Sequence, residues 1–327
     1  MAAARGRSGG AGTASLAPAR GLRGAPRARR YDRPAMAEYP LSGDLSHEGV
    51  VTANADVGPG CFRLDVRCPQ VAARTRPGQF VMLRPRQCLD PFLSRAFSVC
   101  DLRFDDGPSA PPTGICVLIV IVGPGTRALS ERHAGEPIGV LGPLGRPYDL
   151  GTPAEHMVLL AGGVGAAPFA IVARALRQRS REQRVTYLVG GRDAAHIYLA
   201  DEIRALGCDV GVATDDGSAG HKGYVTDLLE PLLVPGVRVL ACGPNPMFKS
   251  LAKVVERARG RGLDFPCQVS TEETMPCGFG ACAGCVVPVV AEVTETTPDG
   301  FRYAKSCVEG PVFPVEVVRW DLIRSTH

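Results

Sequence analysis

Four cysteines near the end of the sequence have the spacing of a metal-cluster site. Cys277, Cys282 and Cys285 follow one another as C-x4-C-x2-C, and Cys307 lies further along. This spacing is typical of plant-type [2Fe–2S] ligation, in which two irons take four thiolates. The glycines between these cysteines would let one tight loop curl around a cluster and aim backbone N–H groups at its sulfurs. A structural zinc site is the alternative, although zinc sites more often show two short C-x2-C pairs.

A second candidate site consists of the ends of successive apolar runs. The residues concerned are Gly162, Gly163, Gly165 and Pro168 after the first run, Asp215 and Gly217 after the third, and Cys242, Gly243, Pro244 and Met247 after the fourth. A buried strand that ends in glycines and opens a helix presents N–H groups and a positive dipole end to a pyrophosphate. Each signal is weak alone. Their convergence on one sheet edge predicts nucleotide binding.

A third group of residues lies in the first half of the chain. It comprises Arg95, Ala96, Phe97 and Ser98, followed later by Gly125 and Thr126. An arginine can bind a phosphate in bidentate fashion, and an aromatic ring can lie against a flat cofactor ring. Gly125-Thr126 could offer an N–H group and a hydroxyl to a second phosphate. Taken alone, the group would favour a solvated strand arginine beside turn glycines, but beside the other two signals it favours a cofactor site.

Three folded parts must position these residues. Residues 45–150 contain short apolar or alternating runs between glycine and proline turns, which predicts an antiparallel sheet closed into a β-barrel. Residues 151–265 contain four β-then-α units, which predict an α/β doubly wound nucleotide domain with a parallel sheet. Residues 266–327 are dense in cysteine and glycine and too few for a core of their own, so a metal would help them to fold.

Some elements can be predicted individually. In the nucleotide domain we expect helices over residues 167–179, 200–206, 225–233 and 246–259, each after a short buried strand. In the C-terminal part we expect short strands at 286–290 and 315–318.

The charge is unevenly distributed along the 327 residues. The formal net charge is +4, yet residues 1–35 contain eight arginines and a single acid, which leaves −3 for the rest. The folded part therefore offers no basic surface for nucleic acid. Residues 1–44 lack apolar periodicity, and we expect a disordered tail. This tail could be a transit peptide, a nucleic-acid or membrane arm, or a translated upstream region before a start at Met36.

Cysteine usage and hydropathy bear on the compartment. The chain has twelve cysteines and no apolar run of the secretory type after the N-terminal arginines, so we expect a cytoplasmic protein with metal or redox chemistry rather than a disulfide scaffold. The uncharged stretch 157–173 contains glycines and a proline in its middle. It therefore predicts a strand, a turn and a helix, with no membrane association.

Several of these segments occur in the order found in one known family. They are Arg95–Ser98, Gly125-Thr126, Gly142–Gly145, Gly162–Pro168, Cys242–Met247, the four cysteines and Cys307–Phe313. The chain resembles the electron-transfer subunits of NAD-dependent dihydroorotate dehydrogenase, within the ferredoxin reductase superfamily. The resemblance covers about residues 45–320. Gly145-Arg-Pro-Tyr and the long gap between Cys285 and Cys307 depart from the family pattern, but neither removes a cluster cysteine.

The resemblance implies FAD in the barrel, NAD on the nucleotide domain and a [2Fe–2S] cluster held by Cys277, Cys282, Cys285 and Cys307. It also implies that Leu118, Ile119 and Val120 line the flavin with Arg95–Ser98, and that Gly125 and Thr126 contact its phosphates. The implied partner is an FMN-bearing dihydroorotate dehydrogenase catalytic subunit, in a heterotetramer that serves pyrimidine (UMP) biosynthesis.

The three predicted sites together indicate an oxidoreductase subunit. Hydride transfer moves two electrons at once, whereas a [2Fe–2S] cluster accepts only one. A flavin can exchange electrons singly or in pairs, so the three sites together predict a protein that splits electron pairs, without a catalytic acid or base. The same layout occurs in flavin subunits of the ferredoxin:NADP oxidoreductase and sulfide dehydrogenase types, which remain alternatives. A zinc-stapled nucleotide-binding module without turnover is the alternative outside the enzymes.

Overall fold

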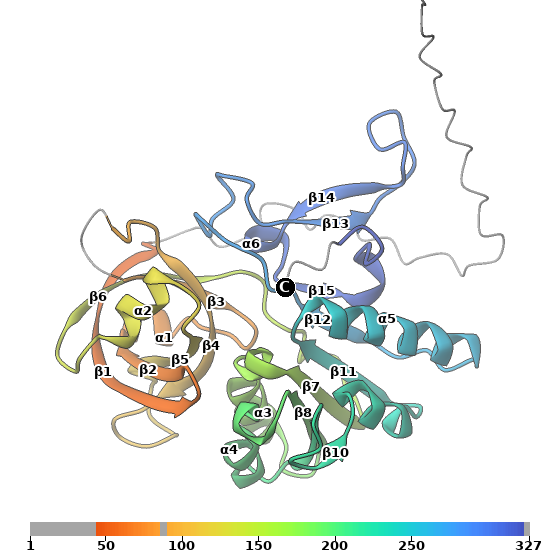
Figure 1. Cartoon of the computed structure of the whole chain (residues 1–327), viewed down its shortest axis with the longest axis horizontal. Helices are drawn as coiled ribbons and strands as arrows, with labels where there is room; N and C mark the ends of the chain where they lie inside the picture. The colour runs from red at the N-terminus through yellow and green to blue at the C-terminus, as the bar shows by residue number, and fades with distance from the viewer. Residues whose placement is uncertain (1–43, 86–89, 324–327) are drawn as a thin grey trace, which may run out of the picture.

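The computed structural model describes residues 44–85 and 90–323. Figure 1 shows an antiparallel barrel, an α/β sheet and a C-terminal segment that meet near the middle of the molecule. Except for Asp44, the predicted tail of residues 1–44 lies outside the described residues.

Six antiparallel strands form a closed barrel in the order β1-β2-β5-β4-β3-β6. They are β1 (Ser46–Gly58), β2 (Cys61–Arg67), β3 (Phe80–Arg84), β4 (Arg95–Arg103), β5 (Gly114–Val120) and β6 (Pro137–Leu144). Apolar residues alternate with more exposed ones, as in β6, where Ile138 and Val140 are buried. The alternation fills the interior with side chains, as expected for a small barrel. Two short helices accompany the barrel, α1 (Pro69–Ala72) and α2 (Pro124–Ser130).

The second part is a seven-stranded sheet in the order β10-β9-β8-β7-β11-β12-β15. Its strands are β7 (His156–Gly162), β8 (Arg184–Gly191), β9 (Asp209–Thr214), β10 (His221–Lys222), β11 (Val237–Cys242), β12 (Cys267–Ser270) and β15 (Val312–Pro314). All neighbours are parallel except β12 and β15. The strand order reverses between β7 and β11, which is the switch point of a doubly wound sheet. The predicted fold class is confirmed.

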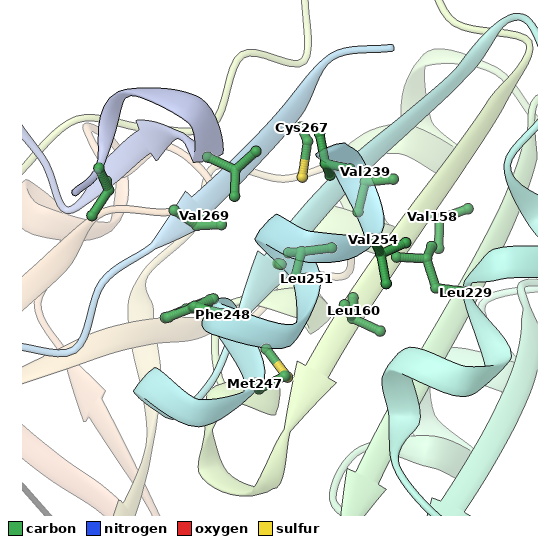
Figure 2. Packing of buried hydrophobic residues seen from close by; sticks show 14 of the residues in the cluster. Val158, Leu160, Leu229, Val239, Met247, Phe248, Leu251, Val254, Cys267 and Val269 are labelled. Atoms are coloured by element: carbon green, nitrogen blue, oxygen red, sulfur yellow. The ribbon is translucent and has the colours of Figure 1, made fainter. Parts of the chain in front are cut away.

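Helices α3 (Phe169–Arg179), α4 (Ala200–Ala205) and α5 (Asn245–Gly260) cover this sheet. Figure 2 shows α5 placing Phe248, Leu251 and Val254 against apolar side chains of the sheet strands, among them Leu160 and Val269. All five of these side chains are buried, so the helix is fixed to the sheet by apolar packing.

Two predicted elements differ from the structure. Residues 225–233 were expected to form a helix, but they form two short 3-10 segments, η4 (Val225–Leu228) and η5 (Glu230–Leu232). Pro231 lacks an N–H group and clashes with a continuing α-helix, which accounts for the break. The strand expected at 315–318 is instead the 3-10 turn η6 (Val315–Val317), directly after β15. The remaining 3-10 segments are η2 (Gly163–Ala166) and η3 (Ala194–His196).

The C-terminal segment is attached to both other parts. Its β12 and β15 extend the nucleotide sheet, so the boundary expected after residue 265 cuts through one sheet. Strands β13 (Val286–Val290) and β14 (Phe301–Lys305) form a separate hairpin, followed by helix α6 (Ser306–Glu309). Met275, Cys285 and Cys307 pack with Phe80 and Met82 of the barrel. This packing holds the cysteine-rich segment against the barrel wall.

Among the described residues, no helix combines the length and apolar character needed to cross a membrane.

Candidate functional site

A cavity of about 630 Å³ lies where the three parts meet; we call it the junction cavity. Eight residues singled out from the sequence line it: Arg95, Ala96, Phe97, Ser98, Leu118, Val120, Thr126 and Cys242. The first seven come from the barrel and α2, and Cys242 comes from the end of β11. The structure therefore brings the barrel group and one nucleotide-domain strand end to a common space.

One wall of the junction cavity was not anticipated from the sequence. It consists of the consecutive residues Ser270, Thr271, Glu272, Glu273, Thr274, Met275 and Pro276, which connect β12 to Cys277. The signal that could have found them is their position, because a segment that follows a parallel strand emerges at the carboxyl edge where ligands bind.

Arg95 and Gly125 are in direct contact at the rim of the junction cavity. A Cβ on Gly125 would lie 2.7 Å from Nε of Arg95, so only glycine leaves the guanidinium where it is. The same guanidinium donates to the Leu93 carbonyl at 2.5 Å. Arg95 is thus held in one orientation, in which its remaining N–H groups suit a phosphate.

The Thr126 hydroxyl is used inside its own turn. Its Oγ1 accepts hydrogen bonds from the backbone N–H groups of Val122 at 2.9 Å and Gly123 at 3.1 Å. This pattern, in which the third helical residue reaches back to the cap, stabilises the start of α2. The Thr126 hydroxyl hydrogen, which a phosphate would need, donates to the Gly123 carbonyl at 3.1 Å, so the hydroxyl predicted to contact a phosphate is already occupied in this conformation.

The run Leu118, Ile119 and Val120 divides between two faces of β5. Leu118 and Val120 line the junction cavity, whereas the Ile119 side chain is buried in the barrel core. Alternation along a strand requires this, since successive side chains point to opposite faces.

The glycine-rich ends of β7 and β11 pack backbone against backbone. A Cβ on Gly162 would lie 2.8 Å from Sδ of Met247, and one on Gly165 would lie 2.6 Å from Cα of Gly243. These glycines therefore allow the two strand ends to approach each other. Gly163, with φ +54°, has no heavy atom within 4 Å of its Cβ position, so it leaves open space at the switch point.

The other strand-end residues lie around this edge. Pro168 and Pro244 directly precede helices α3 and α5. The backbone N–H of Asp215, after β9, donates to Gly191 at the end of β8 at 3.1 Å, and Gly217 lies against the Lys222 side chain. Neither Asp215 nor Gly217 lines the junction cavity, from which β8 separates them.

A thiol and a carboxylate are in contact in the wall of the junction cavity. Sγ of Cys242 lies 4.0 Å from Oε1 of Glu272. Burial and the Glu272 carboxylate both raise the pKa of Cys242, so the thiol stays protonated at neutral pH. Glu272 opens onto the cavity yet has protein on most sides, and this desolvation raises the pKa of its carboxyl group.

The loop of residues 277–285, which we call the cluster loop, directs its backbone amides at a cysteine sulfur. Desolvation raises the pKa of Cys277, but hydrogen bonds from the amides of Cys282 and Phe279 outweigh it and lower the pKa to about 7. The amide of Gly284 donates to Sγ of Cys282 at 3.4 Å. Amide donors stabilise thiolate over thiol, and the thiolate is the form that binds metal.

Cys285 and Cys307 form a second pair. The Cys307 thiol and the Cys307 backbone amide, 3.4 Å from Sγ of Cys285, lower the pKa of Cys285 to about 6. Cys307 keeps the proton of the pair, and its pKa is raised by Cys285 and by burial. The four cysteines thus form two neighbouring pairs, 277 with 282 and 285 with 307.

This arrangement fits a two-iron cluster, in which each iron takes two protein ligands. In the part of the chain that the structure describes, no three His, Cys, Asp or Glu side chains are gathered as ligands of one metal ion. The donor set is nevertheless soft thiolate throughout and rich in amide donors, which suits an iron–sulfur cluster.

Comparison with known proteins bears on the cluster loop and on the nucleotide domain. Residues 272–319 match the model described as "Iron-sulfur cluster binding domain of dihydroorotate dehydrogenase B". Residues 159–253 match the "Oxidoreductase NAD-binding domain". These matches confirm the iron–sulfur and NAD predictions for the two segments.

Whole-chain relatives decide the family. The "Dihydroorotate dehydrogenase B (NAD(+)), electron transfer subunit" of Desulforamulus reducens is 33% identical over 81% of this chain and 95% of its own length. The chain belongs to this family. The subunit of the same name from Geobacillus thermodenitrificans is 36% identical over 77% of this chain and 90% of its own length. The family resemblance and the oxidoreductase class predicted from the sequence are confirmed.

A solved structure extends the likeness to the arrangement in space. The NADH-dependent reduced ferredoxin-NADP oxidoreductase, described in a study of flavin-based electron bifurcation, superposes with a TM-score of 0.67 at 27% identity. The match covers 86% of this chain and 92% of that one. The likeness therefore extends over both the barrel and the sheet that enclose the junction cavity.

Proposed function

We propose that this chain is the electron-transfer subunit of an NAD-dependent dihydroorotate dehydrogenase, which receives electrons from the FMN of a catalytic subunit and delivers them to NAD+. The observation that carries the proposal is the junction cavity, whose walls come from the barrel, the end of β11 and the segment leading to Cys277. A flavin there would have the nucleotide site on one side and the cluster loop on the other.

The cofactor roles follow from the chemistry of the lining residues. When bound, FAD exchanges hydride with a nicotinamide and single electrons with an iron–sulfur cluster. Arg95 offers bidentate donors to a flavin phosphate, while Phe97 and Leu118 give apolar contact to the ring. The neutral Cys242 thiol lies where the nicotinamide would approach from the switch point.

The cluster ligands in this proposal are Cys277, Cys282, Cys285 and Cys307. The lowered pKa values of Cys277 and Cys285 favour their thiolate forms. Met275 and Phe80 pack with Cys285 and Cys307 and also line the junction cavity, so the proposed cluster and flavin sites share these side chains. In this proposal, residues 45–150 bind FAD, residues 151–265 bind NAD and residues 266–327 hold the cluster.

The partner, the heterotetramer and the cytoplasmic location expected from the resemblance are part of this proposal. The dihydroorotate oxidation itself belongs to the partner. NAD+ binding is assigned to the switch point between β7 and β11.

The decisive experiment is anaerobic co-purification of the tagged chain from its native cells. We expect a dihydroorotate dehydrogenase catalytic subunit in stoichiometric amount, and reduction of NAD+ by dihydroorotate only when both are present. Iron, acid-labile sulfide and flavin measured on the same sample separate a flavin–cluster protein from a colourless zinc module.

The likeness to the ferredoxin-NADP oxidoreductase structure supports a second candidate, a subunit of another NAD(P)H redox complex. A different redox subunit in the co-purified complex would favour that candidate and reject the dihydroorotate assignment.

A further inference from the structure

A lysine from the neighbouring hairpin reaches the cluster loop. Lys305 is the last residue of β14, and its Nζ donates to the carbonyl oxygen of Gly280 at 2.6 Å. Gly280 lies between Cys277 and Cys282, in the middle of the cluster loop. The half-buried Lys305 side chain therefore brings a positive charge to the loop that presents the proposed cluster ligands.

The backbone around Lys305 is held in register with a second cysteine. Lys305 pairs with Val286 in the β13–β14 hairpin, and the next amide, of Ser306, donates to the Cys285 carbonyl at 2.9 Å. The Glu309 carboxylate accepts the Lys305 backbone N–H at 3.2 Å, and its other oxygen accepts from Arg302 at 2.7 Å. These contacts fix where the lysine side chain starts.

Gly280 links the ammonium to a third cysteine. Its carbonyl accepts from Lys305, while its own amide donates toward the sulfur of Cys307. A Cβ at Gly280, where φ is +90°, would lie 2.7 Å from Cγ2 of Val308, so the loop cannot easily carry a side chain there. The Lys305 ammonium thus lies one residue away from a hydrogen bond to a proposed ligand sulfur.

We propose that Lys305 is a positioning residue for electron transfer, because it holds a fixed positive charge beside the cluster and favours its reduced state. The inference rests on the proposed function. Reduction adds one electron to the cluster without making or breaking a bond at the lysine, and the electron comes from the partner's flavin in the proposed function or from dithionite in the test. A nearby cation stabilises the added negative charge, and net charge is one of the factors that set cluster potentials.

Lysine could instead act only as a mechanical tie between β14 and the loop. Two neutral substitutions separate the two roles. Lys305→Met removes the charge and the hydrogen bond, whereas Lys305→Gln removes the charge but keeps an N–H donor for the Gly280 carbonyl. Lys305→Arg keeps the charge. Lys249→Met is the matched control, since Lys249 is also half-buried and donates to a backbone carbonyl, that of Ile323, outside the cluster loop.

The test is a dithionite titration of the anaerobically purified complex, followed by the electron paramagnetic resonance signal of the reduced cluster. At the wild-type midpoint potential, we expect the ratio of reduced to oxidised cluster to fall at least about fivefold in Lys305→Met and Lys305→Gln, because at an effective dielectric constant of about 20 a unit charge has that effect even from about 17 Å. The ratio should stay unchanged in Lys305→Arg and Lys249→Met.

Three results would overturn the inference. One is a cluster midpoint potential equal to that of the wild type in both neutral variants. Another is a wild-type midpoint potential in Lys305→Gln alone, which would mean that the hydrogen bond to the loop matters and the charge does not. The third is loss of iron from both neutral variants, which would make Lys305 an assembly residue. Failure of the proposed function looks different, because the wild-type protein itself would then lack the [2Fe–2S] signal.

Discussion

Three of the four proposed cluster ligands lie within residues 277–285, whereas the junction cavity takes its walls from residues as far apart as Phe80 and Pro311. The cluster loop orders its cysteines with amides of the same short segment. The cavity depends instead on how the barrel is seated against the sheet. A change in the loop should therefore affect one cofactor, and a change at the junction should affect binding and stability together.

The largest expected effect is loss of the cluster in Cys277→Ser. A serine hydroxyl does not supply the soft thiolate that iron–sulfur clusters require. We expect iron and acid-labile sulfide to fall to background while FAD stays bound, because Cys277 does not line the junction cavity. Metal analysis and the visible spectrum of the purified variant measure both quantities.

The matched control for this substitution is Cys208→Ser. Cys208 is also a free cysteine; it is buried where Cys277 is half-buried, and it lies beside the nucleotide sheet. It should keep a full iron complement. Equal iron in both variants would remove Cys277 from the ligand set, and loss of FAD together with iron would mean that loop and cavity do not behave independently.

An intermediate effect is expected from Gly125→Ala. The new methyl group would meet the Arg95 guanidinium, which is the flexible end of a side chain, so the fold survives and Arg95 moves. Loss of one charge-assisted contact of about 1.4 kcal/mol corresponds to roughly tenfold weaker FAD binding. Fluorescence titration of the apoprotein with FAD measures the change, and the iron content should stay at the wild-type level. An unaltered FAD affinity would show that Arg95 does not bind the flavin phosphate.

The contrast between the two regions also explains what the sequence could predict. The cysteine spacing, the glycine-rich strand ends and the Arg95–Ser98 segment are local patterns, and each appears in the structure as a local feature. The Ser270–Pro276 wall is not a local pattern, because its role depends on β12 lying beside β11. No spacing within the segment itself reports that neighbour.

Other differences have the same origin. β15 follows Cys307 in the chain but pairs with β12, so the C-terminal part could not be separated from the nucleotide sheet by composition. The Thr126 hydroxyl is the right group in the right segment, yet its own turn uses it. Sequence patterns identify which residue types are available, and long-range packing decides which of their atoms remain free.

The smallest expected effect concerns the contact that seats the barrel on the sheet domain. Arg174 of α3 binds Asp101 of β4 through two hydrogen bonds, Nε to Oδ1 at 2.9 Å and Nη2 to Oδ2 at 2.6 Å. Asp101 is only 8% exposed, and Arg103 lies 3.7 Å from the same carboxylate. Arg174→Met should therefore lower the free energy of unfolding by about 1 kcal/mol, less than for a fully buried pair, because Arg103 still compensates Asp101 and Arg174 is partly solvated.

Arg67→Met is the control, since Arg67 also binds a carboxylate, that of Asp105, but both side chains are about half exposed. It should change the free energy of unfolding by less than about 0.5 kcal/mol.

Urea unfolding of the two variants is followed by flavin fluorescence and by the absorbance of the cluster. The two signals give the free energy of unfolding and also show whether the flavin site or the cluster site is lost first. If Arg174→Met releases flavin at lower urea while the cluster absorbance is lost at the wild-type concentration, the cavity depends on the seating of the barrel and the loop does not. Simultaneous loss of both signals would instead mean that Met275 and Phe80, which pack against the cysteines and also line the cavity, couple the two regions into one cooperative unit.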